Sequence, residues 1–371
     1  MSNLIGQPDA NATEASSPEP TFRPALHGFA IVLMIATFVL LLIGGNVTSK
    51  DAGLAVPDWP TTFGHNMFFA PPHLWTGPGN EPQFWEHAHR LMGSLVGGLM
   101  ILMVLWLMLS QQRRPWLIWY GLAMLLAVIV QGIMGGLRVT EISLGWAYLH
   151  GVLGQLFLCM TVILTAATGR FWIHRKSNRH ECIQPAPTYA RLGSWALLTV
   201  LLIQLLLGAA VRHTKAGLAI PDFPLSYGQL IPPLAQDQLD AIWAKASETG
   251  ATLPYRVNQV AAAFAHRTWS VVVVAVTLFV ALTLRRLRHT ARPSVSLLLL
   301  LTLQMLLGAL IIWTSRRTDI ATAHQAIGAA VLGVATLLAI RVHLGGSARS
   351  SMVDKTKQAT TGIHPSQGKP A

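Results

Sequence analysis

The segment GLAVPDWP at residues 53–60 is repeated almost unchanged as GLAIPDFP at residues 217–224. The spacing of 164 residues holds through Gly64 and Gly228, so the match extends well beyond a chance dipeptide. Such a repeat indicates that the chain contains two copies of one structural unit.

Histidines occupy matching places in the two copies. His89-Arg90 and His266-Arg267 each follow one copy of the repeated segment and open a long apolar stretch. A second histidine, His150 in the first half and His324 in the second, stands at the head of a further apolar stretch. Function is therefore to be sought where these histidines converge.

The composition predicts a membrane protein. Charged residues make up 11% of the chain, less than half of what a soluble domain carries. Eight nearly uncharged stretches each approach the roughly 20 helical residues that cross a hydrocarbon core. They are 25–49, 91–112, 115–137, 142–169, 192–211, 268–284, 293–315 and 320–340. We expect the second and sixth helices to extend a little earlier, to include His89 and His266. We predict an all-α polytopic fold whose eight transmembrane helices form two pseudo-symmetric four-helix bundles.

The net charge of +12 is a topology signal and does not indicate a nucleic-acid partner. Basic residues gather in the segments that follow the second, fourth, sixth and eighth helices. They are Arg113, Arg114, Arg170, Arg175, Lys176, Arg179, Arg285, Arg286, Arg288, Arg292, Arg341 and Arg349. The positive-inside rule makes these segments and both termini cytoplasmic. The location that we expect is the inner membrane of a bacterial cell. The repeated segments then lie in outer loops.

The predicted organisation has four parts. Residues 1–24 and 346–371 are polar and are expected to be disordered cytoplasmic tails. The first carries Asp9, Glu14 and Glu19, unlike an Arg-rich, acid-poor transit peptide. Residues 25–175 form the N-terminal half and residues 176–345 the C-terminal half. Cys159 lies within a predicted helix and Cys182 in a cytoplasmic segment, which excludes an outer disulfide.

The four matched histidines lie near the outer ends of four predicted helices. Ionisable residues within membrane helices usually face the bundle interior and mark a functional path. A lone histidine there is more often an interhelical hydrogen-bonding group. The duplication of His89, His150, His266 and His324 favours ligation of a metal or of haem iron.

The local sequence favours haem over a bare ion. A small residue follows each histidine by four positions, and a flat macrocycle could lie against it; these residues are Gly93, Gly154, Ser270 and Gly328. Close helix packing in lipid is the alternative explanation. Zinc would call for cysteines or clustered carboxylates as further ligands, and none accompany the histidines. Arg90 and Arg267 either pair with haem propionates or extend to lipid headgroups.

The two halves differ at one position. Glu86 lies one helical turn before His89, whereas Ala263 holds the equivalent place before His266. A carboxylate beside one of two matched sites suggests proton chemistry there. Alternatively, Glu86 complements a helix dipole.

Three further repeats are weaker signals. Gln131, Gln204 and Gln304 each precede a glycine by four residues, which is typical of close helix packing. Asp58 and Asp222, each between prolines, are interpreted as turn residues.

The chain resembles the haem A synthase family (CtaA/Cox15 type) over residues 27–343. The resemblance rests on the segment Glu86-His87-Ala88-His89-Arg90 and on three shorter motifs, Leu149-His150-Gly151, Ala265-His266-Arg267 and Ala323-His324-Gln325. The paired outer loops are also similar to those of that family. Some members carry a cysteine pair in the first outer loop, and this chain has none there.

The resemblance implies an oxidoreductase that converts the C8 methyl group of haem O into the formyl group of haem A for cytochrome oxidase. Successive hydroxylations lead to a hydrated aldehyde, which loses water. Glu86, His89 and His150, with Arg90, would serve the haem O substrate. His266 and His324, with Arg267, would hold a haem b cofactor.

Two other functions stay open at this point. A di-haem cytochrome b subunit that only transfers electrons would not need Glu86 in one half alone. A transporter built from repeats is less compatible, because these repeats run parallel and no broken helix is indicated. The electron acceptor, the oxygen source, homo-oligomerisation and contact with haem O synthase or oxidase assembly factors are not defined by the sequence.

Overall fold

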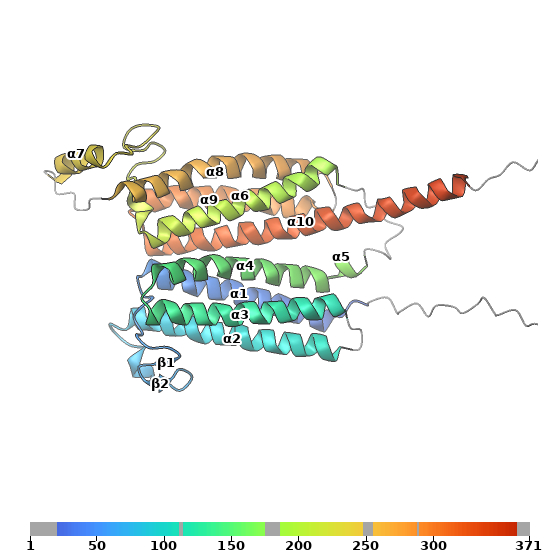
Figure 1. Ribbon diagram of the computed structural model, residues 1–371, viewed down its shortest axis with the longest axis horizontal. Helices are drawn as coiled ribbons and strands as arrows, with labels where there is room; N and C mark the ends of the chain where they lie inside the picture. Colours follow the sequence, from blue (N-terminus) through green and yellow to red (C-terminus); the bar gives the residue numbers. More distant parts are fainter. Residues whose placement is uncertain (1–20, 111–113, 175–185, 248–254, 288, 362–371) are drawn as a thin grey trace, which may run out of the picture.

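The computed structural model describes residues 21–110, 114–174, 186–247, 255–287 and 289–361, without the side chains of 246–247 and 345–361. Within these ranges, eight helices are long and apolar enough to cross a membrane (Figure 1). They are α1 (Pro24–Ser49), α2 (Glu81–Leu109), α3 (Pro115–Thr140), α4 (Leu144–Thr168), α6 (Thr188–His213), α8 (Val257–Leu284), α9 (Ala291–Trp313) and the Thr318–Leu344 part of α10 (Thr318–Thr361). The predicted all-α membrane fold is confirmed.

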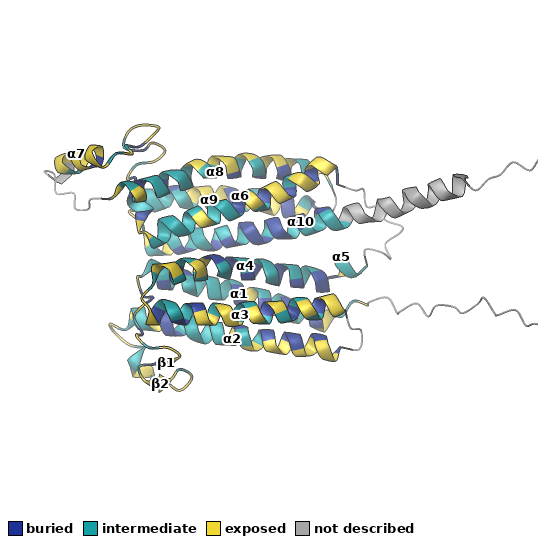
Figure 2. Ribbon diagram, in the orientation of Figure 1, coloured by how far each residue is buried: buried dark blue, intermediate teal, exposed yellow. Residues whose placement is uncertain are grey.

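The spanning helices form two bundles of four. One large core cluster joins α1 to α4 and includes Leu33, Met100 and Leu164. A second joins α6, α8, α9 and α10 and includes Leu197, Leu297 and Leu338. Lipid tails are as apolar as these side chains, so close packing stabilises such bundles more than the hydrophobic effect does. Exposed residues accordingly cover the outward faces of the helices (Figure 2).

The bundles meet through α1 and α4 of the first and α6 and α10 of the second. A polar seam joins them at one end. Arg212 on α6 donates to the carbonyl of Gly45 at 2.6 Å and to Ser49 at 3.0 Å, both on α1. Ser49 also accepts a 2.9 Å hydrogen bond from Thr322 on α10. The two halves are thus held together beside the ends of the helices that carry the histidines.

Helices α2 and α8 begin about ten residues before their apolar stretches, at Glu81 and Val257. The first turns of α2 are covered by protein, because Glu86 and His87 are 4% and 1% exposed. Where a folded loop and not lipid surrounds a helix, its residues can be polar and still be helical. This places Glu86 and His89 well inside a helix.

The two outer loops share one local structure. Strands β1 (Thr61–Thr62) and β2 (His65–Asn66) pair antiparallel in the first loop, and Ser226 bridges Gln229 at the matching place in the second. Both loops contain a cis proline peptide, Trp59-Pro60 and Phe223-Pro224. Gly64 and Gly228 have φ of 77° and 73°, a left-handed conformation that favours glycine. The sequence repeat is therefore a structural repeat.

Short helices complete the connections. The first loop also contains η1 (Pro72–Leu74), and the second contains η2 (Ala216–Leu218) and the inserted α7 (Gln236–Ser247). A single turn, α5 (Arg170–Ile173), follows α4.

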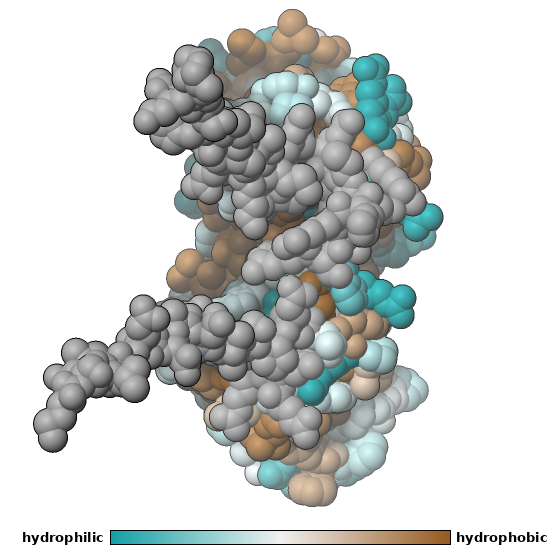
Figure 3. Space-filling view, turned by 90° about the vertical axis from the view of Figure 1, so that its right-hand side faces the viewer, coloured by the Kyte–Doolittle hydropathy of each residue, from teal (hydrophilic) through white to brown (hydrophobic). Residues whose placement is uncertain are grey.

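Helix α1 begins and α10 ends toward the same end of the molecule, opposite the two outer loops (Figure 1). Hydrophilic residues occur on the described part of that end, while apolar residues surround it (Figure 3). The C-terminal segment differs from the prediction, since helix α10 continues past residue 346 to Thr361. This segment contains no proline before Pro365, so the loss of apolar residues ends the membrane span without ending the helix. Residues 1–20 and 362–371 lie outside the described residues.

Candidate functional sites

Each of the four histidines packs against a glycine of the preceding spanning helix. A methyl group on Gly44 would lie 2.9 Å from the His89 ring, and one on Gly208 would lie 3.0 Å from the His266 ring. The corresponding distances are 3.2 Å for Gly135 to His150 and for Gly308 to His324. Real Cβ atoms rarely approach so closely, so each glycine provides the space in which an imidazole lies.

The structure brings the histidines together in pairs, one pair to a half. The rings of His89 and His150 face each other edge to face, with centroids 6.1 Å apart. His266 and His324 also lie close enough to interact electrostatically. The predicted pairing of α2 with α4 and of α8 with α10 is therefore what the fold produces.

The histidine nitrogens fit the ligation of an iron porphyrin. The buried Nδ1 atoms of His89, His266 and His324 have no hydrogen-bond partner among the described residues. They lie near the carbonyls of Leu40, Gln204 and Gln304 but outside hydrogen-bonding geometry. His150 Nδ1 reaches the equivalent carbonyl, that of Gln131, at 3.1 Å. A ring whose Nδ1–H faces a carbonyl keeps Nε2 as the ligand atom. In the second half, the amides of Gln204 and Gln304 face Nε2 and would have to move aside for an iron to bind there.

A bare metal ion fits less well. The described residues contain no group of three or more histidine, cysteine, aspartate or glutamate side chains that could hold an ion. Two imidazoles per half suit an iron whose other four ligands come from a macrocycle.

Three glutamines contact the histidines, a role that the sequence analysis missed. The amide nitrogen of Gln304 lies 3.2 Å from His324 Nε2, and that of Gln204 lies 3.5 Å from His266 Nε2. If the Gln131 amide is turned so that both of its ends are satisfied, its nitrogen lies 2.9 Å from His150 Nδ1. That contact requires an Nδ1 without hydrogen, so it is an alternative to the hydrogen bond from Nδ1 to the Gln131 carbonyl. Leu40 stands at the fourth equivalent position, opposite His89. The available signal was the spacing of each glutamine four residues before the glycine that receives the ring.

The small residues four positions after the histidines differ among themselves. Open space surrounds the position that a methyl group on Gly93 would take. Gly154 instead faces Leu41, and Gly328 faces Gln304. Ser270 donates to the Arg267 carbonyl at 2.6 Å. Among these four, only Gly93 adjoins free space.

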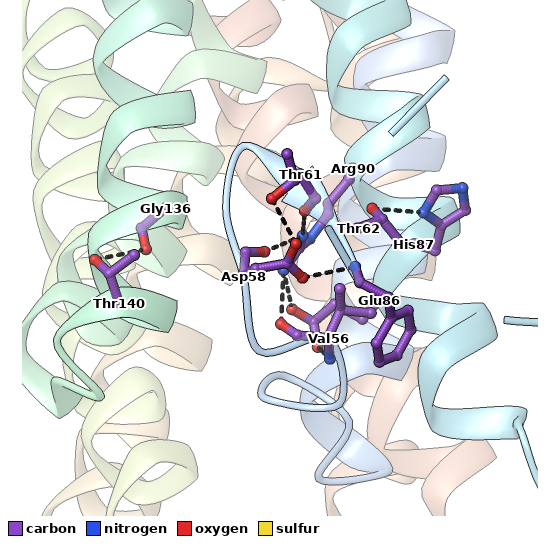
Figure 4. Close-up of polar contacts among 10 residues, drawn as sticks. Val56, Asp58, Thr61, Thr62, Glu86, His87, Arg90, Gly136 and Thr140 are labelled. Atoms are coloured by element: carbon purple, nitrogen blue, oxygen red, sulfur yellow. Dashed lines mark hydrogen bonds and ion pairs between the residues drawn. The ribbon is translucent and has the colours of Figure 1, made fainter. Parts of the chain in front are cut away.

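Glu86 is buried between α2 and the first outer loop (Figure 4). Its Oε2 accepts a 2.9 Å hydrogen bond from the amide of Val56, and its Oε1 forms a 2.8 Å ion pair with Arg90. Both contacts hold the carboxylate in place against the loop and the helix. The neighbouring His87 contacts Thr62 at 3.2 Å and Trp75 beneath the loop, away from lipid.

Arg90 and Arg267 anchor the outer loops, a role different from the two that the sequence left open. Arg90 donates to the carbonyls of Val56, Asp58 and Thr61 at 2.6 to 2.9 Å. Together with the bond to Glu86, these contacts occupy all four hydrogens of its terminal nitrogens. A propionate could bind there only by displacing one of them.

The second half repeats this anchor without an acid. Arg267 donates to the carbonyls of Ile220 and Asp222 at 2.7 Å and to that of Leu225 at 3.3 Å. These three residues are the equivalents of those that Arg90 contacts, and Ala263 stands where Glu86 would be. Loop anchoring therefore does not require a carboxylate.

The repeated aspartates accept hydrogen bonds from residues of their own loops. Asp58 accepts hydrogen bonds from Thr61 and from the amides of Phe63 and Gly64. Burial raises the pKa of Asp58, but these hydrogen bonds outweigh it and leave the pKa below its usual value. Asp222 accepts from the amides of Tyr227 and Gly228 in the same way. Their interpretation as turn residues agrees with these contacts.

An arginine that the sequence analysis did not single out completes the N-terminal site. Arg138, in the last turn of α3, lies so close to Gly53 that a methyl group there would overlap its guanidinium. It acts electrostatically on Glu86, His89 and His150. Arg138 makes no hydrogen bond or ion pair within the described ranges.

Two matched helix bundles, each with a pair of neighbouring histidines inside it, define a class of polytopic membrane proteins built from a duplicated four-helix unit. Over residues 27–336 the chain matches the family model of COX15-CtaA, described as cytochrome oxidase assembly protein, and it belongs to this family. It is 26% identical to a heme A synthase of Methylorubrum populi, over 92% of each chain. It is 30% identical to a heme A synthase of Methylobacterium radiotolerans, over 84% of this chain and 89% of the relative.

Proposed function

We propose that the protein is a haem A synthase, an oxidoreductase that converts the C8 methyl group of haem O into a formyl group. Membership of the family and the relatives of that name support the activity. The observation that carries it in this chain is the buried Glu86 beside one of two otherwise matched histidine pairs. A di-haem electron-transfer subunit is not favoured, because a carboxylate on one side alone serves no purpose in it.

The two halves take different roles. His89 and His150 bind the iron of the haem O substrate in the N-terminal half. His266 and His324 hold haem b in the C-terminal half. This group supplies one-electron transfer when bound. The polar seam of Arg212, Ser49 and Thr322 keeps the two sites in fixed relation.

Glu86 is the base at the substrate site. The Val56 amide and Arg90 each use one lone pair of a carboxylate oxygen, so a second lone pair on Oε1 or Oε2 can take a proton from the oxidised methyl carbon or from the water that adds to it. The folded outer loop covers this carboxylate and limits its access to bulk water.

We propose an inner-membrane location with both termini cytoplasmic. The basic residues after α2, α4, α8 and α10 support this orientation through the positive-inside rule. Haem O, a largely apolar molecule with two carboxylates, would then reach the N-terminal site from the lipid. Contact with haem O synthase or with oxidase assembly factors stays a prediction.

Co-expression with a haem O synthase tests the activity, with chromatography of the extracted haems as the measurement. We expect haem A to appear only when both proteins are present. Protohaem alone in purified protein, with haem O unchanged in the membranes, would instead support the electron-transfer subunit.

A further inference from the structure

Among the described residues, no anion forms a hydrogen bond or an ion pair with Arg138. Among the other arginines at this end of the bundles, Arg90 and Arg267 bind loop carbonyls and Arg212 binds α1. Arg138 has no such acceptor in the described part of the chain, and Glu86 is already paired through Arg90. A half-buried guanidinium is costly unless it meets a negative partner. The N-terminal site therefore offers one charge that the protein itself does not neutralise.

Of the four helices that carry a glycine under a histidine ring, only α3 has a charged residue at the position of Arg138. In each of α1, α3, α6 and α9, a glycine receives a histidine ring. The residues three places after these glycines are Val47, Arg138, Val211 and Ile311. Only α3 has a charged residue there, so the pseudo-symmetry of the halves does not require it.

The repeated outer loop makes room for this side chain. Gly53 is the first residue of the repeated segment, and a methyl group on it would overlap the Arg138 guanidinium. Its counterpart Gly217 faces only the aliphatic Cδ of Arg316, at 3.5 Å. The loop of the first half thus lies directly over the free charge, above the His89–His150 pair.

We propose that Arg138 binds a propionate carboxylate of the haem that enters the N-terminal half, replacing Arg90 in that role. The inference rests on the proposed function, since a haem with two carboxylates is the anion that this site would receive. It also provides a difference between the sites: the substrate haem meets a cation on α3, and the haem of the C-terminal half meets Ile311 at the equivalent position.

The test compares haem O with its dimethyl ester, which lacks carboxylate charge. Each is titrated by absorption into detergent-solubilised protein that retains its C-terminal haem. The wild type is expected to bind haem O about 10- to 100-fold more tightly than the ester, as one charge-assisted hydrogen bond provides. In Arg138→Gln this preference should fall to about threefold or less, and the KM for haem O should rise by a similar factor with kcat little changed.

Two further variants complete the design. Arg138→Lys keeps the charge and should retain most of the preference, whereas Arg316→Gln, at the matching glycine of the other half, should leave it unchanged. An undiminished preference in Arg138→Gln would overturn the assignment, as would a complete loss in Arg138→Lys that folds and binds the ester normally.

The variant His89→Ala distinguishes a failure of the Arg138 assignment from a failure of the proposed function on which it rests. If His89→Ala leaves haem O binding unchanged, the N-terminal half is not the substrate site and the proposed function fails. If His89→Ala weakens binding while Arg138→Gln keeps the preference, only the role of Arg138 is wrong.

Discussion

The two halves share a scaffold and differ in a few side chains. Both place two imidazoles on glycines, and both fasten an outer loop with an arginine beside the first histidine. The first half adds Glu86 and Arg138 where the second has Ala263 and Ile311, and it has Leu40 where the second has Gln204. We propose that the features common to both halves bind a haem and cover it. By the same proposal, those confined to one half mark where a substrate is recognised and altered.

The largest expected effect comes from the shared ligands of the C-terminal half. Replacing His266 or His324 with alanine removes one of two axial ligands, so the low-spin bis-histidine spectrum of the purified protein should be lost or altered. The corresponding changes at His89 and His150 should leave that spectrum in place. Absorption and electron paramagnetic resonance spectra provide the measurement. An unchanged spectrum and full haem b content in both C-terminal variants would contradict the ligand assignment.

Glu86→Gln tests the main difference between the halves. The amide keeps the shape and the Val56 contact but cannot take up a proton, so haem A formation should fall about 10²- to 10⁴-fold, the usual range for lost acid–base help. Haem b content should stay normal, and haem O or a partly oxidised intermediate should accumulate in extracted membranes.

Glu81→Gln is the matched control. Glu81 lies on the same helix, but it is exposed and pairs with Lys50 at 2.7 Å. Its replacement should leave the haem products unchanged. Near-normal haem A in Glu86→Gln would assign Glu86 to loop anchoring alone.

Hydropathy predicted the spanning helices because lipid selects an apolar surface along their whole length. It placed the starts of α2 and α8 too late, because protein and not lipid surrounds residues such as Glu86 and His87. The continuation of α10 beyond residue 346 was missed for a related reason: a polar segment without proline can remain helical outside the membrane.

Duplication revealed the histidines, since four matched ionisable residues stand out in apolar sequence. The role of the glycines beneath the histidines could not be predicted, because a glycine such as Gly44 resembles any residue of close helix packing until its neighbour is known. The role of Arg90 was equally hidden. Its acceptors are backbone carbonyls of a distant loop, and backbone carbonyls leave no pattern of residue types in the sequence.

The loop anchors should differ in their contribution to stability. Arg90→Gln leaves the buried carboxylate of Glu86 without its ion-pair partner, which typically costs about 3–5 kcal/mol. Arg267→Gln breaks similar carbonyl contacts but leaves no buried charge unpaired. It should therefore lower the free energy of unfolding by only about 1–3 kcal/mol. Thermal unfolding in detergent gives the comparison. Equal losses would mean that the Glu86–Arg90 pair adds nothing to the first loop.

The smallest effect concerns Asp58 in the first loop. Because its folded pKa is depressed, Asp58 stabilises the loop above the ordinary carboxyl pKa of about 4, and this contribution is lost as pH falls through the lower folded value. Asp58→Asn keeps some hydrogen bonding but no charge, so it should weaken the loop by about 1 kcal/mol or less at neutral pH. It should also remove the acid-dependent opening that the wild type shows below about pH 4. Hydrogen exchange of residues 53–66 between pH 3 and 6, corrected for intrinsic rates, measures both effects. A wild-type loop whose protection does not change over this range would show that the Asp58 carboxylate is not what keeps it closed.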